Sequence, residues 1–204
     1  MKIYREITIL LLLTAISACS KMTADNSGIA PQKVIHGEVN PESYADAAKE
    51  TLAHAQNLAN SEPPPEHELD VDIGKIEALL TLSAQKDLDK EHAYDAALMS
   101  TLGSLYARKA QINKNTPRIA GELVAKAFRY LDKAVSLYPQ DLGARITRGF
   151  VSSKVPDFLG KAEVAYEDLT YVRNSADFSK LPVSLQETIK QSLAEVDSRR
   201  RTSM

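Results

Sequence analysis

The sequence has little of what marks several common protein classes. It contains no tryptophan, one cysteine and 8 glycines among 204 residues, and its formal net charge is −2. A single cysteine excludes an internal disulfide, so a packed core must stabilise the folded part. A charge near zero argues against a nucleic-acid-binding protein, which would carry a basic excess on one face. We therefore expect no nucleic-acid partner.

Signals for β-structure and for catalysis are also weak. Val, Ile and Thr do not alternate with polar residues over any long stretch, whereas the helix formers Ala, Leu, Lys, Glu and Gln are abundant. His67-Glu68 lacks the second histidine of a zinc-protease motif, and no glycine-rich run precedes Gly160-Lys161. We expect a helical protein that is not an enzyme, with no metal site and no cofactor.

The longest apolar run, residues 7–15, follows Lys2 and Arg5 and leads into Ile16-Ser17-Ala18-Cys19. Its length, roughly ten residues, suits a secretory signal and is below the ~20 residues that span a bilayer. This segment resembles a bacterial lipoprotein signal peptide with residues 16–19 as the lipobox. The resemblance implies cleavage before Cys19 and acylation of the Cys19 thiol. The alternative is an ordinary cleaved signal in which Cys19 has no role.

Lipidation of Cys19 would hold the mature protein on a membrane. Each buried methylene contributes about 0.8 kcal/mol, and stable attachment takes more than one chain. In lipoprotein sorting, an Asp after the cysteine marks retention in the inner membrane. Ser20 at this position favours the outer membrane, facing the periplasm, in a host with two membranes. The polar residues after it, up to residue 40, are typical of a flexible tether.

Helical periodicity begins at Pro41. The predicted organisation is a signal peptide over 1–18, a lipidated cysteine with its tether over 19–40, and an all-α domain over 41–204. Asp70 and Asp72 are expected to be charges near a helix start, and the tail from Arg199 is expected to fray. Capping residues, prolines and apolar spacing predict helices over 41–60, 72–88, 89–112, 117–137, 142–153, 157–173 and 183–200.

Two helices in the middle of the chain carry a spaced pattern of small and large residues. The pattern comprises Met99, Leu102-Gly103 and Tyr106, then Ala127, Leu131, Ala134 and Pro139. It resembles the tetratricopeptide repeat, in which small residues let two antiparallel helices approach and a proline ends the second helix. The chain departs from that pattern by about a dozen extra residues between the two halves.

A second, more degenerate unit follows over Arg145 to Asn174. Gly149 takes the small position, and Ala162, Tyr166 and Leu169 take the positions of the second helix. The resemblance covers residues 91–174, less than half of the chain. It implies a tetratricopeptide-like array of about six to seven helices in antiparallel pairs, with a curved surface that binds a protein or peptide.

Arg145 and Arg148 occupy positions that are usually apolar in this repeat. Because they are three residues apart, they share one helix face and could bind a carboxylate of a partner. The alternatives are a solvated face or internal ion pairs with Asp141, Asp157 or Asp168.

A second candidate is the apolar segment that joins the two helices of the degenerate unit. It contains Phe150, Val151, Val155, Phe158 and Leu159, where a polar turn would be expected. Either it is an exposed docking edge, or it is a packed turn that closes the core. Phe158 and Tyr106 complete the candidate partner-binding residues, with Arg145 and Arg148.

These observations lead to one functional expectation and one alternative. The expected protein is a membrane-anchored lipoprotein that acts as a scaffold or accessory subunit of an envelope transport, secretion or assembly complex, with another protein as its partner. The alternative is a lipoprotein that binds a small acidic ligand near Arg145 and Arg148 for a transporter.

Overall fold

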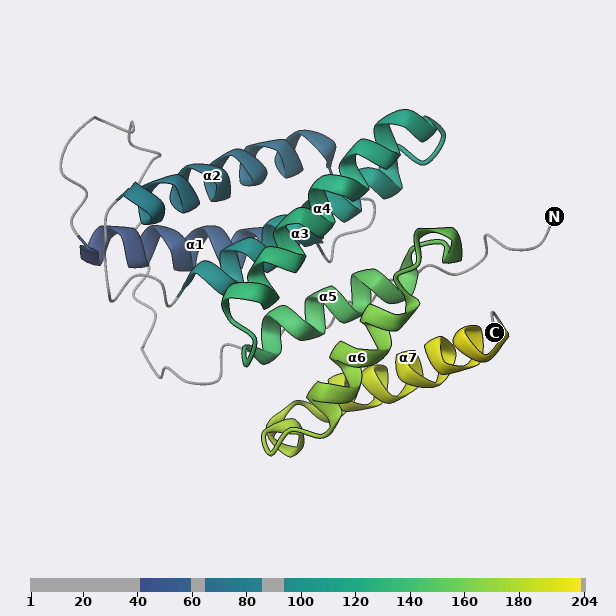
Figure 1. Cartoon of the computed structure of the whole chain (residues 1–204). Helices are drawn as coiled ribbons and strands as arrows, with labels where there is room; N and C mark the ends of the chain where they lie inside the picture. The colour runs from purple at the N-terminus through teal and green to yellow at the C-terminus, as the bar shows by residue number, and fades with distance from the viewer. Residues whose placement is uncertain (1–40, 60–64, 86–93, 203–204) are drawn as a thin grey trace.

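The computed structural model of the chain describes residues 41–59, 65–85 and 94–202 (Figure 1). These residues form no strand, and the expected all-α array of antiparallel helix pairs is confirmed. Cys19, the lipobox and residues 20–40 lie outside the described residues. The α-helices are α1 (Pro41–Ala59), α2 (Glu66–Gln85), α3 (Asp95–Ile112), α4 (Pro117–Leu137), α5 (Leu142–Lys154), α6 (Ala162–Arg173) and α7 (Val183–Thr202).

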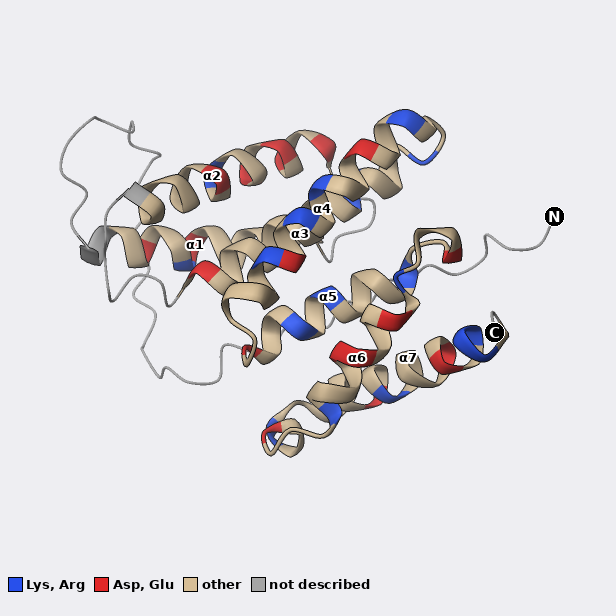
Figure 2. Ribbon diagram, in the orientation of Figure 1, with Lys and Arg blue, Asp and Glu red and all other residues tan. Residues whose placement is uncertain are grey.

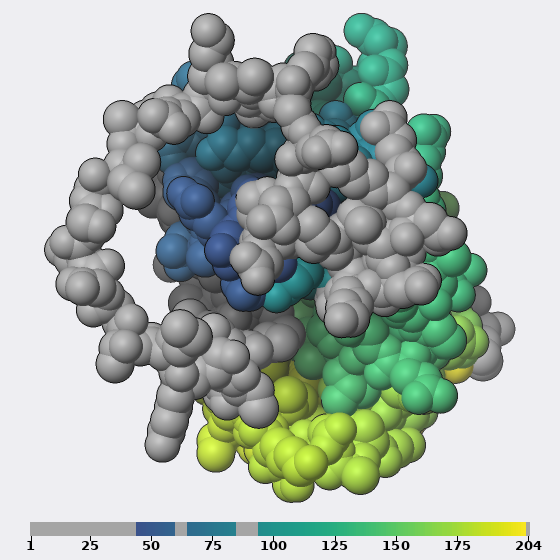
Figure 3. All heavy atoms as spheres, turned by 90° about the vertical axis from the view of Figure 1, so that its left-hand side faces the viewer, coloured from purple at the N-terminus to yellow at the C-terminus, as the bar shows by residue number. Residues whose placement is uncertain are grey.

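Helix α3 is at the centre of the first half of the array. It contacts α1, α2, α4 and α5, and most of its residues are buried, including Ser100, Thr101 and Ser104. A helix buried on several sides needs small or apolar residues around its circumference, and α3 has them. Helix α5 then connects this half to α6 and α7 (Figure 1). In the view of Figure 3, the blue N-terminal helices lie above the yellow-green C-terminal part of the chain.

Two glycines set the closest approaches within the helix pairs. A Cβ atom added to Gly103 of α3 would lie 2.6 Å from Leu131 Cγ and 3.0 Å from the Ala127 carbonyl oxygen of α4. A Cβ added to Gly149 of α5 would lie 2.8 Å from Leu169 Cγ of α6. The predicted packing of a small residue against a large one is therefore confirmed for Gly103 and Leu131.

The predicted register of the second unit is wrong by three residues. Leu169 occupies against Gly149 the place that Leu131 occupies against Gly103. The residues four before and three after it, Ala165 and Val172, are fully buried, whereas Tyr166 is only half-buried. The cause is a short 3₁₀ turn, η2 (Asp157–Leu159), which ends at a left-handed Gly160 with φ of 65° and delays the start of α6.

The core has two main parts. One lies between α1, α2, α3 and α4, and includes Tyr44, Leu69 and Leu102. The other lies between α5, α6 and α7, and includes Ile146, Leu169 and Ile189. Smaller apolar clusters, such as Phe128 with Leu131 and Val151, join α4 to α5. Helix α5 therefore contacts helices of both halves of the array.

Helix α2 begins six residues before its predicted start. The carbonyl oxygen of Pro65 accepts hydrogen bonds from the backbone N–H groups of Glu68 and Leu69, so the helix starts directly after the last proline. Asp72 is consequently not a charge near the helix start. It is fully buried, and His54 Nδ1 of α1 lies 2.6 Å from its Oδ2 atom, which ties α1 to α2.

Three further boundaries differ from the predictions. Helix α6 starts at Ala162 rather than residue 157 because η2 and Gly160 precede it. Helix α3 is described from Asp95, and residues 86–93 lie outside the described part. Helix α7 runs to Thr202, so the expected fraying from Arg199 is wrong up to that residue.

The close approach at Gly103 yields a test of the array. Substituting Gly103→Ala should lower the free energy of unfolding by about 1–2 kcal/mol, because overpacking of about 1–3 kcal/mol exceeds the gain in helix propensity. Gly74→Ala is the matched control, since nothing lies within 4 Å of a Cβ there, and it should raise stability by about 0.5–1 kcal/mol. Denaturant unfolding measures both, and equal stabilisation by the two variants would contradict this packing.

Candidate functional site

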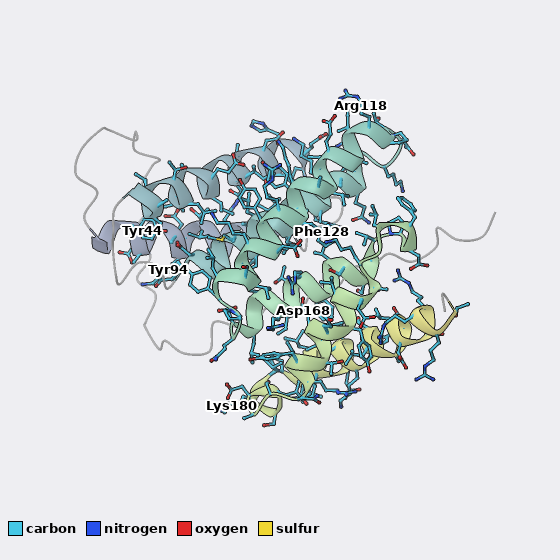
Figure 4. The ribbon with its side chains drawn as sticks, viewed as in Figure 1. Tyr44, Tyr94, Arg118, Phe128, Asp168 and Lys180 are labelled. Atoms are coloured by element: carbon cyan, nitrogen blue, oxygen red, sulfur yellow. The ribbon has the colours of Figure 1, made fainter. Side chains whose placement is uncertain are left out.

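The two candidate arginines meet one buried carboxylate. Arg145 Nη1 lies 2.8 Å from Asp168 Oδ1, and Arg148 Nε lies 2.6 Å from Asp168 Oδ2, with Arg148 Nη2 3.0 Å from Oδ1. Asp168 is fully buried between α5 and α6 (Figure 4), and the arginine side chains are 16% and 15% exposed. The structure thus pairs Arg145 and Arg148 internally, with one of the three aspartates considered from the sequence.

This cluster extends to a third helix. Arg148 Nη1 lies 3.1 Å from Asp132 Oδ1 of α4, and Lys161 Nζ lies 3.4 Å from Asp132 Oδ2. Arg145 Nε donates to the carbonyl oxygen of Pro139, and its guanidinium lies 4.0 Å from the centre of the Tyr171 ring. Three cations and two carboxylates therefore connect α4, α5 and α6.

Arg148 keeps its charge in this setting. Burial lowers the pKa of its guanidinium, but hydrogen bonds and charge from Asp168 and Asp132 outweigh burial and raise the pKa overall. An ion pair that is mostly shielded from water resists breaking, because the remaining charge would be left buried. Binding of a partner by Arg145 and Arg148 stays a prediction, and such a partner would have to compete with Asp168.

Tyr106 is part of the interior rather than of an open surface. Its hydroxyl donates to Glu77 Oε1 of α2 over 2.7 Å, and its ring stacks on Tyr130 of α4 with centroids 6.0 Å apart. The Tyr130 hydroxyl donates to the same Glu77 oxygen over 3.3 Å. One carboxylate therefore joins α2 to both α3 and α4, and a role of Tyr106 in partner binding stays a prediction.

The apolar segment around Phe158 divides into two parts. Phe150 and Val151 are buried and Val155 is half-buried, as expected of a packed turn. Phe158 is 85% exposed and Leu159 is 38% exposed, as expected of a docking edge. The packed-turn interpretation therefore holds for Phe150 and Val151, while docking of a partner at Phe158 stays a prediction.

The carboxylates of Glu77 and Asp132 were not predicted as partners of the candidate residues. Each pairs across a long stretch of sequence, as in the bond between Tyr130 and Glu77, 53 residues apart. Helical spacing reveals neighbours three or four residues apart and carries no signal for such contacts. An acid on an otherwise apolar face is the one sequence feature that could have pointed to them.

Two kinds of feature are absent from the described residues. None of their helices combines the length and the apolar character needed to cross a bilayer. No group of three or more His, Cys, Asp or Glu side chains within residues 41–59, 65–85 and 94–202 is arranged to hold a metal ion.

The chain was compared with families, characterised proteins and structures. No protein-family model, no curated protein and no solved structure matches it.

The buried carboxylate can be tested by one conservative substitution. Asp168→Asn keeps the shape but leaves Arg145 and Arg148 without their shared anion, so it should lower the free energy of unfolding by about 3–5 kcal/mol. Glu122→Gln is the control, because its ion pair with Arg118 is well exposed, and it should cost no more than about 1 kcal/mol. If chemical unfolding showed a similarly small loss of stability for Asp168→Asn and Glu122→Gln, the cluster would not stabilise the fold.

The buried tyrosines yield a pH prediction. Burial, followed by the charge of Glu77 or Asp95 and hydrogen bonds to them, raises the pKa values of Tyr106, Tyr130 and Tyr138. Above about pH 10 the unfolded chain loses these protons while the folded chain keeps them, so stability should fall as pH rises further.

The free energy of unfolding, measured from about pH 8 to pH 11, tests this slope. Tyr106→Phe should flatten the slope because it removes one of the retained protons. Leu137→Ala, at an exposed residue without a titratable group, should leave the slope as it is. A wild-type stability that does not change above pH 10 would refute the prediction.

Proposed function

We propose that this protein is a membrane-anchored lipoprotein that faces the periplasm and acts as a protein-binding scaffold or accessory subunit of an envelope transport, secretion or assembly complex. The observation that carries the proposal is the lipobox-like stretch Ile16-Ser17-Ala18-Cys19 behind a short apolar run. The array of paired helices over residues 41–202 supports it, because stacked helix pairs offer extended surfaces to other proteins.

The mechanism follows from anchoring. A domain held at a membrane meets a partner in the same membrane at a high effective concentration, so a modest interface suffices for binding. Exposed apolar side chains on the array, with Phe158 the most exposed of them, supply contacts that a partner would bury. The helical domain would then provide specificity, and the lipid on Cys19 would keep the protein at the membrane.

A protein partner has more support than a small acidic ligand. The arginines that would hold such a ligand, Arg145 and Arg148, are already paired with Asp168 and are mostly shielded from water. A ligand would have to displace a fully buried carboxylate, which costs several kcal/mol. A protein can instead use the surface that the array leaves exposed.

The anchor is tested by fatty-acid labelling in the host. The wild-type protein should take up an alkyne-tagged fatty acid and stay with membranes after an alkaline wash. Cys19→Ala should take up none, because the acylated thiol is absent, while Ser20→Ala should be labelled like the wild type. Undiminished labelling of Cys19→Ala would refute the lipoprotein assignment.

A further inference from the structure

The turn around Phe158 presents an aromatic ring to solvent. Phe158 is 85% exposed, and its neighbour Leu159 is 38% exposed. Burying a phenylalanine side chain contributes about 1.5–3 kcal/mol, which this turn forgoes in the free protein. Single exposed apolar residues are common, so exposure alone does not define a site, and the construction of the turn is the more informative feature.

The backbone of the turn is fixed by its own hydrogen bonds. The Leu159 N–H donates to the Pro156 carbonyl over 3.0 Å, and the Gly160 N–H donates to the Asp157 carbonyl over 2.9 Å. Gly160 takes a left-handed conformation, which favours glycine, and reverses the chain into α6. Pro156 restricts the backbone at the entry to the turn.

Arg199 of α7 holds the same turn from a distant part of the sequence. Its guanidinium donates to the carbonyl oxygens of Ser153 and Val155 and to the Asp157 carboxylate. These contacts connect residues more than 40 positions apart. The exposed ring is therefore presented from a backbone that two elements hold in place, which lowers the entropy cost of docking it.

The charges around the turn are unevenly exposed. Asp157 is 61% exposed against 29% for Arg199, and Glu163 is 56% exposed against 20% for Arg200. The Arg200 guanidinium also lies over the Tyr166 ring, with its central carbon 3.9 Å from the ring centre. Figure 2 shows acidic and basic residues side by side near the end of α7. In these two ion pairs the carboxylate is the more exposed group, whereas in the pair of Arg201 with Asp197 the guanidinium is the more exposed one, at 78% against 30%.

We propose that Phe158 inserts into an apolar pocket of a protein partner whose rim carries Lys or Arg facing Asp157 and Glu163. Aromatic side chains surrounded by polar contacts that exclude water are typical binding hot spots. Facing charges of opposite sign fix orientation and speed association. Because Asp157 and Glu163 are paired with Arg199 and Arg200, the turn offers an anionic lipid surface no net positive charge, so a protein fits it better than a membrane. The inference rests on the proposed scaffold function and names the contact that it uses.

Photocrosslinking in the intact host tests the contact. A benzoylphenylalanine is placed at position 158 of the full-length chain in one strain, and at position 183 in another. Val183 is also well exposed but lies at the opposite end of α7. We expect position 158 to crosslink to one protein segment that mass spectrometry shows to contain apolar residues with Lys or Arg.

Other crosslinking results would overturn the inference. Crosslinks of position 158 to lipid, or to a segment without basic residues, would contradict the stated chemistry. Crosslinks to protein at position 183 but not at 158 would overturn the docking turn while leaving the scaffold function intact. An absence of protein crosslinks at both positions would overturn the inference and count against the scaffold as well.

Binding to the crosslinked protein, once purified, gives the second measurement. Phe158→Ala should weaken binding at least tenfold, and Glu163→Lys should slow association most at low salt, whereas Val183→Ala should bind like the wild type. Thermal unfolding checks that each variant is folded, as expected for exposed side chains. Wild-type affinity of folded Phe158→Ala would overturn the proposal.

Discussion

The second half of the array depends on a carboxylate that no water reaches. Asp168 is fully buried, and Arg145 and Arg148 hold it from the preceding helix. Because Arg148 also reaches Asp132 on α4, and Arg145 reaches the backbone before α5, the same ion cluster orients three helices. A buried charge tolerates few alternative arrangements, since any of them leaves it unpaired. The cluster thus fixes how α6, and with it α7, docks on α5.

Much of the fold could be predicted from the sequence because helices depend on local signals. Pro117 marked the start of α4 and Pro139 its end, and Gly103 with Leu131 predicted a close helix pair. The start of α2 and the register of α6 could not be predicted in the same way. They depend on where Pro65 accepts its hydrogen bonds and on the turn at Gly160. Neither feature changes the apolar periodicity from which helices are predicted.

The residue types of the candidate site could be predicted from the sequence, but the way in which these residues pair could not. Arg145 and Arg148 were recognisable as charges on an apolar face, and Asp168 was among their possible partners. Only the geometry selects Asp168 over the other two aspartates. Asp141 instead caps α5, and Asp157 accepts a hydrogen bond from Arg199. With the arginines paired inside, Phe158 is the most exposed of the candidate residues, and Arg199 holds the turn that carries it.

In the proposed function, this helical array works from a lipid anchor at Cys19. Mass spectrometry of the N-terminal peptide, taken from protein extracted from host membranes, measures this most directly. We predict that the mature chain begins at Cys19 and that this residue carries acyl chains. A mature chain that begins at another residue, or at an unmodified Cys19, would contradict it.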